Sequence, residues 1–237
     1  MYQSHKLYVK PDTKVLEMIE ENHSLLLFLE HLEIDFSVGD KSVMVLCREY
    51  NVDLNLFLII ANMYNGFYPD REDVQRIRDI SGVIRLLKNS HLFFKEDKYV
   101  EIKNSLETLK RLYDTEDIPL IEKFFDDYFN EVVEHLDYED NIAFPYFLAL
   151  LDSGSKLSES MFKVSVYKDN HSDIETKLTD LKNLLLKYIK LQGNLSVRRK
   201  FLISLYELES DLVIHSLIEE LILLPLIARV EKERSNG

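Results

Sequence analysis

The sequence predicts an all-α protein in which a small helical domain precedes an up-down-up-down four-helix bundle. One pattern, His-x3-Glu-x4-[Phe/Leu]-Pro, occurs twice, with its histidines at His135 and His215. Apolar residues around both copies recur in alternating steps of four and three, which is typical of bundle helices. Four histidines at positions 91, 135, 171 and 215 are separated by 44, 36 and 44 residues. This alternation suits four antiparallel helices that each place one histidine at a common depth.

Residues 1–66 are expected to form the small N-terminal domain. Thr13 is predicted to cap a first helix, and a second apolar run follows at 25–32. A glycine turn then precedes two short helices at 42–49 and 54–65. Residues 67–79 are predicted to be a linker, because Asn65-Gly66, Pro69 and a run of charged residues disfavour a buried element.

The bundle is assigned to residues 80–237. Its first helix is expected to run from Ile77 to about Lys95, with His91 on the inner face beside Ile84, Leu87 and Phe94. The stretch 99–113 either continues this helix or packs as its neighbour. The second helix is predicted to open at Asp117-Ile-Pro119, where proline is tolerated in the first turn. It either ends near Pro145 or kinks there and continues to Leu151.

The second half of the bundle begins after a loop at 152–158. A third helical region at 159–190 contains His171, and a fourth helix runs from about Ser196 through His215 to about Glu231. Pro145 and Pro225 each follow a motif glutamate by six residues and are predicted to loosen the helix just beyond it.

The motif residues fall on the predicted inner faces of their helices. The series around the first copy is Ile121, Phe125, Tyr128, Val132, His135, Glu139 and Ile142; the second is Phe201, Leu205, Leu208, Leu212, His215, Glu219 and Ile222. A single buried histidine is usually a hydrogen-bonded core residue. Several imidazoles and two carboxylates in one dry interior would be costly without a cation. The sequence therefore predicts a metal site, with ligands suited to iron, manganese or zinc.

The two motif copies and the lone histidines resemble the hemerythrin-like domain of the di-iron proteins of the repair-of-iron-centres family. In that family two histidines bind each iron and two glutamates bridge the pair. Metals between facing helices are also a feature of up-down-up-down bundles in general. The resemblance implies an oxo- and carboxylate-bridged pair of iron ions, with manganese or zinc as weaker choices. Its implied ligands here are His91, His135, Glu139, His171, His215 and Glu219.

The resemblance also implies a role. Proteins of this family act in the response to nitric oxide or oxidants and restore damaged iron–sulfur centres, by donating iron or reducing nitric oxide. The implied partners are oxygen or nitric oxide, and iron–sulfur proteins. Whether this chain turns over a substrate stays open, since a sensor that binds oxygen or nitric oxide without turnover would need the same site. A metal-free helical adaptor is the third alternative.

The N-terminal domain departs from the family. Where the family has Asp-Phe-Cys-Cys-Gly, this chain has Asp35-Phe36-Ser37-Val38-Gly39, so the turn is kept without its thiols. The sequence thus gives no support for a thiol-based role there. The single cysteine, Cys47, has no histidine at a motif spacing and is predicted to be a packed core residue.

Composition and charge argue against some of the remaining classes of function. A net charge of −13 argues against direct nucleic-acid binding, which needs a basic face. No apolar run approaches the length of a membrane span, and the N-terminus lacks a signal-peptide pattern, so a cytoplasmic location without membrane attachment is expected. Oligomeric state is not indicated. Two further acids lie close in sequence to the predicted ligands: Glu175, four residues after His171, and Glu131, one turn before His135. Their spacing is compatible either with a contact to a metal ligand or with a solvated surface position.

Overall fold

The computed structural model describes residues 7–152, 171–190 and 192–235, and regular structure in these ranges is helical. The all-α prediction is confirmed. The chain divides into two compact units, one formed by Met1–Ser90 with Leu217–Gly237 and the other by His91–Ser216. No helix in the described ranges is both long enough and apolar enough to cross a membrane.

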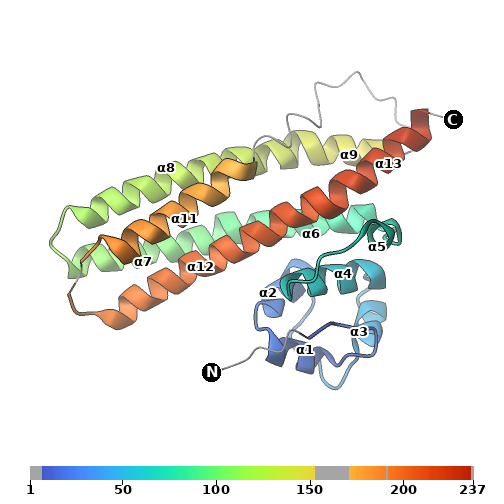
Figure 1. Ribbon diagram of the computed structural model, residues 1–237, viewed down its shortest axis with the longest axis horizontal. Coiled ribbons are helices and arrows are strands. Elements are labelled where there is room, and N and C mark those ends of the chain that lie inside the picture. The colour runs from blue at the N-terminus through green and yellow to red at the C-terminus, as the bar shows by residue number, and fades with distance from the viewer. Residues whose placement is uncertain (1–6, 153–170, 191, 236–237) are drawn as a thin grey trace. The chain divides into compact units, whose positions relative to one another are not determined.

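Four short helices build the N-terminal part of the first unit (Figure 1): α1 (Val15–Glu21), α2 (Leu25–His31), α3 (Val43–Glu49) and α4 (Leu54–Tyr64). The helices predicted at 42–49 and 54–65 are confirmed to within one residue. Asp53 begins α4 by accepting a hydrogen bond from the Leu56 amide at 3.0 Å. The prediction for Thr13 is wrong: Lys14 precedes α1, and the Thr13 hydroxyl accepts from the Lys10 amide at 2.9 Å, which closes the preceding turn.

A short helix, α5 (Arg71–Gln75), lies inside the range predicted as a linker. Asp70 and Asp73 form a capping box, in which the Asp73 amide donates to the Asp70 side chain at 2.9 Å. The charges that suggested an exposed linker thus also start a helix. Val74 is buried, and the α5 carbonyl of Gln75 accepts a hydrogen bond from Arg229 at 3.3 Å.

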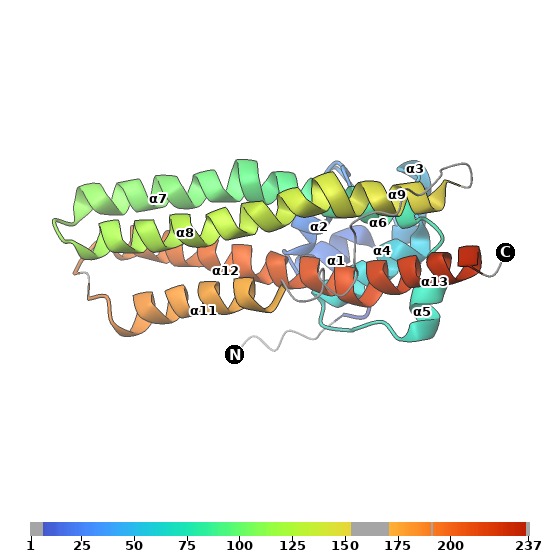
Figure 2. The same cartoon turned by 90° about the horizontal axis from the view of Figure 1, so that it is seen from above.

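The second unit is an antiparallel four-helix bundle made of long, continuous helical segments (Figures 1 and 2). The stretch after His91 continues its helix, which settles that alternative, and the segment through Pro145 continues to Leu151. The helical elements of the second unit are η1 (Phe93–Lys98), α7 (Tyr99–Leu112), α8 (Asp117–Tyr138), η2 (Glu139–Ala143), α9 (Phe144–Leu151), α11 (His171–Lys187) and most of α12 (Leu195–Ile218). The elements α6 (Ile80–Leu92), η3 (Glu219–Leu223) and α13 (Leu224–Ser235) belong wholly or mostly to the first unit. The predicted loop beyond Asp152 and the predicted helical residues 159–170 lie outside the described ranges.

The three η elements are π-helical turns, in which the backbone hydrogen bonds span five residues instead of four. In η2 the Phe144 amide donates to the Glu139 carbonyl. Proline explains this widening: Pro145 has no N–H, and its ring would clash with the carbonyl four residues earlier. The extra residue shifts the inner face by one position. Ile142, predicted to be buried, is therefore 46% exposed, whereas Ala143 is fully buried.

The centre of the bundle is apolar. The inner faces of α7, α8, α11 and α12 bury one contiguous cluster, which includes Ile102, Phe125, Val132, Leu181 and Leu205. Tyr99 stacks on Phe129 with ring centroids 4.5 Å apart. Phe125, Val132 and Leu205 keep the predicted steps of four and three, and burial of such apolar side chains stabilises this part of the bundle.

Each pair of neighbouring bundle helices is also joined by a lysine and an acid. Lys103 of α7 lies 2.7 Å from Glu122 of α8, and Lys177 of α11 pairs with Glu131 of α8. The other two pairs are Lys182 of α11 with Glu209 of α12, and Lys98 of η1 with Glu207 of α12 at 2.9 Å. These pairs add little stability where they are exposed, but they favour one order of helices around the bundle.

Candidate metal centre

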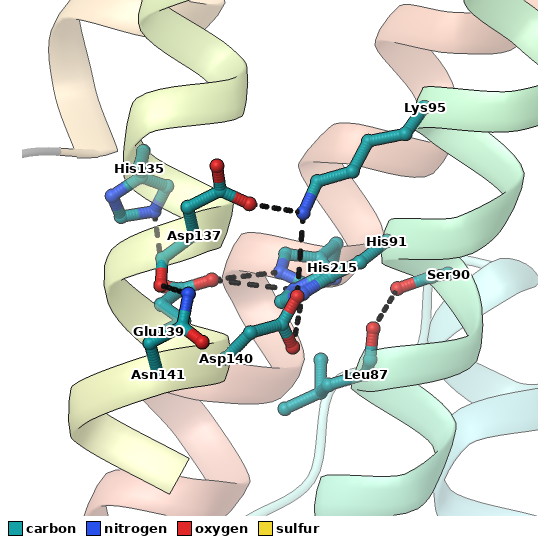
Figure 3. Close-up of polar contacts among 10 residues, drawn as sticks. All are labelled: Leu87, Ser90, His91, Lys95, His135, Asp137, Glu139, Asp140, Asn141 and His215. Carbon is teal, nitrogen blue, oxygen red and sulfur yellow. Dashed lines mark hydrogen bonds and ion pairs between the residues drawn. The ribbon is translucent and has the colours of Figure 1, made fainter.

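One carboxylate and three imidazoles meet inside the second unit (Figure 3). Glu139 is the first residue of η2, and His135 stands one turn before it at the end of α8. The His135 Nε2 atom lies 3.0 Å from Glu139 Oε1. The Nε2 atoms of His91, from α6, and His215, from α12, lie 3.3 and 3.8 Å from Glu139 Oε2. Three of the predicted helices therefore bring four of the predicted ligands together.

The centre is buried, and imidazoles surround its carboxylate. Glu139 is 0% exposed and His91 is 1% exposed. Burial raises the pKa of the Glu139 carboxyl, but hydrogen bonding with His135, His215 and His91 outweighs it and holds this pKa well below its usual range. Glu139 is therefore a carboxylate at neutral pH despite its burial, which is the form that binds a metal ion.

Aromatic rings enclose the histidines. Phe144, the residue before the motif proline, stacks on His91 with ring centroids 5.5 Å apart and an interplanar angle of 21°. Phe94 meets the His215 ring edge-on at 5.7 Å. Both phenylalanines are fully buried. Their rings exclude water from the imidazole faces and limit how far the histidines can turn.

The structure adds two polar residues that the sequence reasoning missed. Asp140 Oδ1 lies 3.0 Å from the Nδ1 atom of His91, and Lys95 Nζ lies 3.3 Å from Asp140 Oδ2. The pKa of Asp140 is subject to burial, which raises it, but contact with His91 and Lys95 leaves it lower than usual. A usable signal was present: an acid directly follows the glutamate in both motif copies, as Asp140 and Glu220.

The remaining predicted ligands are placed less completely. Glu219 begins η3 as Glu139 begins η2, and its side chain is also 0% exposed, but it belongs to the first compact unit. His171 begins α11, and its side chain lies outside the described part of the structure, as does that of Glu175. The Glu131 side chain is half exposed and pairs with Lys177, so it does not line the centre with the histidines.

The donor set fits a metal ion. One ligand atom from each of His91, Glu139 and His215 lies within 4.8 Å of the others. Metal–ligand bonds of about 2.1 Å place neighbouring donors about 3.0 to 3.4 Å apart in octahedral or tetrahedral sites. The contacts of 3.3 and 3.8 Å to Glu139 are close to this range. Imidazole and carboxylate without thiolate are ligands for iron, zinc, manganese and related ions.

Comparison with known families agrees with this chemistry. The model of the Hemerythrin HHE cation binding domain matches residues 100–227, more than half of the chain. The match contains both motif copies and His171, and it begins after His91. No curated protein gives a match. The specific repair-of-iron-centres family is not distinguished by this comparison. With its helical bundle and its buried histidine–glutamate cluster, the chain belongs to the hemerythrin HHE cation-binding domain family.

Proposed function

We propose that this protein is a non-haem di-iron protein of the nitric oxide and oxidative stress response. Its two iron ions would be held by His91, His135, Glu139, His171, His215 and Glu219. The observation that carries the proposal is the Glu139 carboxylate, which is fully buried and lies 3.0 to 3.8 Å from three imidazole nitrogens. Such a carboxylate is well suited to neutralising a cation shared with those histidines.

The choice of iron rests mainly on the resemblance to the di-iron family and in part on the type of ligands. The group His91, Glu139 and His215 has two histidines and one carboxylate, a set typical of non-haem iron centres that leave positions open for a small molecule. When bound, iron would supply one-electron chemistry and an open position for oxygen or nitric oxide. A structural zinc site would instead be closed by four protein ligands.

The chain's own residues have three tasks at this site. His91, His135 and His215 offer neutral nitrogen donors, and Glu139 offers the charge. The Phe94 and Phe144 rings exclude water. Asp140 contacts the other ring nitrogen of His91, Nδ1, at 3.0 Å.

The physiological role follows from the resemblance of the doubled motif to proteins that repair iron–sulfur centres. We infer a cytoplasmic protein whose partners are nitric oxide or oxygen and damaged iron–sulfur proteins. The absence of the family's paired cysteines from residues 35–39 means that any such repair would proceed without thiols from this domain.

Metal analysis tests the first part of the proposal. Protein purified without oxygen is expected to contain two iron ions per chain, with Mössbauer parameters of a coupled non-haem pair. Added manganese and zinc serve as competitors. Protein that retains neither iron nor another transition metal after purification and reconstitution would contradict the proposal and favour the helical adaptor.

Reaction with nitric oxide tests the second part. With an electron donor supplied, the iron-loaded protein is expected to consume nitric oxide or to restore the activity of an iron–sulfur enzyme inactivated by it. The matched control is the same protein after iron removal. Reversible binding of nitric oxide or oxygen, without consumption or repair, would instead assign the protein to the sensor class.

A further inference from the structure

His91 has a carboxylate near each of its two ring nitrogens. Its Nε2 atom lies 3.3 Å from Glu139 Oε2, and its Nδ1 atom lies 3.0 Å from Asp140 Oδ1. The two acids are consecutive residues of η2, so a single turn places a carboxylate near each ring nitrogen of His91 (Figure 3). A neutral imidazole has one N–H and one lone pair, and the partner at one nitrogen decides which role the other takes.

Asp140 is itself held in place. Lys95, one turn after His91 on the same helical segment, lies 3.3 Å from Asp140 Oδ2 and 2.7 Å from Asp137 Oδ1. Asp140 is 23% exposed, whereas Asp137 is 55% exposed. Lys95 therefore contacts both acids, the partly buried Asp140 and the exposed Asp137. This arrangement fixes the oxygen that faces His91.

The second motif copy does not repeat this arrangement at the corresponding position. Glu220 follows Glu219 as Asp140 follows Glu139, but its side chain is exposed to solvent. The two copies thus agree in the histidine, the glutamate and the π turn, and differ in the residue that comes next. Glu220 is consequently a natural control for Asp140: an acid at the same motif position without burial.

We propose that Asp140 is a positioning residue that holds His91 as its Nδ1–H tautomer and points the Nε2 lone pair at the metal position formed with Glu139 and His215. The inference rests on the proposed metal site and deepens it. A carboxylate behind a histidine ligand fixes the ring and raises its basicity, and removing such a partner typically weakens metal binding about 10- to 100-fold. The position bound by His91 is therefore expected to hold its metal more tightly because of Asp140.

The first test uses metal-free protein, so that it does not depend on the metal. Long-range 1H–15N spectra of 15N-histidine-labelled protein, with His91 assigned from a His91→Gln variant, report which ring nitrogen carries the proton. We expect Nδ1 to carry a proton in the native chain, whether or not Nε2 also carries one beside Glu139, and to lose it in part of the molecules in Asp140→Ala. Asp140→Asn keeps an acceptor oxygen and should retain the proton on Nδ1. A native His91 that is protonated on Nε2 alone, or an unchanged spectrum in Asp140→Ala, would overturn the proposal.

The second test measures metal retention in the full-length protein. Iron-loaded Asp140→Ala is titrated with a chelator beside Glu220→Ala and Asp137→Ala. One of the two ions should be lost at about 10- to 100-fold lower chelator concentration in Asp140→Ala, and one Mössbauer doublet should change. Glu220→Ala should match the native protein, and Asp137→Ala should nearly match it. Equal loss of metal from Asp140→Ala and Glu220→Ala would reject the positioning role.

The two tests separate this inference from the proposed function. If native protein binds no metal, the proposed function fails, and the tautomer of His91 still decides the role of Asp140. If metal binds as proposed but Asp140→Ala leaves both tautomer and retention unchanged, only the positioning role fails. Should Asp140→Ala not fold, Asp140→Asn replaces it in the retention test, with a smaller expected loss because the charge alone is removed.

Discussion

The apolar middle of the bundle and its metal centre are built on the same helices, yet they are stabilised in opposite ways. On α8, Phe125 and Val132 bury hydrocarbon against neighbouring helices and need nothing else. Further along the same helical segment, Glu139 occupies an equally dry position and carries a charge. The first region is complete within the polypeptide, whereas the second is well matched to a cation that the polypeptide does not supply.

This difference teaches how far a periodic pattern can be trusted. Steps of four and three predict only that a position faces inward, and they hold equally for Val132 and for Glu139. The chemistry of the inward side chain then decides whether it stabilises the fold or can bind a metal ion. The predictions below separate these two contributions.

The largest effect is expected from Glu139→Gln, which removes the charge at the centre while keeping the volume. Metal content should fall from two ions per chain to fewer than one. The increase in unfolding free energy on adding metal, about 4 kcal/mol at a thousandfold excess over Kd, should disappear. Metal analysis and thermal unfolding with and without iron measure both. Glu131→Gln, an exposed acid two turns earlier on the same helix, is the control and should keep its metal. Full metal retention in Glu139→Gln would show that Glu139 is not a ligand.

Phe125→Ala should have the reverse signature. Removing a fully buried aromatic ring from the apolar cluster costs about 3 to 5 kcal/mol of unfolding free energy. The number of iron ions per folded chain should stay the same, because the ring packs among Tyr99, Tyr128 and Phe129 and not against the histidines. Denaturant unfolding gives the loss of stability, and metal analysis of the folded fraction gives the stoichiometry. A parallel loss of metal would mean that the two regions are not separable.

The smallest effect is expected at the partly buried pair of Lys103 with Glu122, because Lys110 also contacts Glu122. Contacts with Lys103 and Lys110 lower the pKa of Glu122 from its usual 4.5. A carboxyl with a depressed pKa contributes stability above its unfolded pKa and loses it as pH falls through the folded value. Lys103→Met should therefore cost less than about 1 kcal/mol at neutral pH, and the cost should shrink below pH 4.5. Denaturant unfolding across this range checks it; a cost that grows on acidification would contradict this account.

Much of the bundle could be predicted from the sequence because helical periodicity is a local property. The inward placement of His91, His135, Glu139, His215 and Glu219 followed from spacing alone. Ile142 was misplaced because periodicity assumes 3.6 residues per turn, and the π turn imposed before Pro145 breaks that assumption. The proline six residues after each motif glutamate signals the π turn but not its effect on burial, since Ile222 stays buried before Pro225.

Two other features could not be predicted in full from the sequence, for a different reason. The acid after each motif glutamate marks Asp140 as a candidate, but its contact with His91 joins two helices, and no spacing within either helix identifies that partner. The helix α5 depends on Asp70 and Asp73 bonding to each other's amides, whereas their charges alone suggested solvent exposure. Pairing between distant segments, and the local choice between solvation and capping, are decided only by the folded chain.

The π turn at Glu139 changes which side of the helix faces the interior before and after it. Each residue of an α-helix advances the rotation by about 100°, so one surplus residue turns everything downstream by that angle. The helices α8 and α9 can therefore turn different faces toward the interior while remaining one continuous helix. The glutamate sits where the phase changes, and deleting one residue there would swing the enclosing ring of Phe144 away from His91.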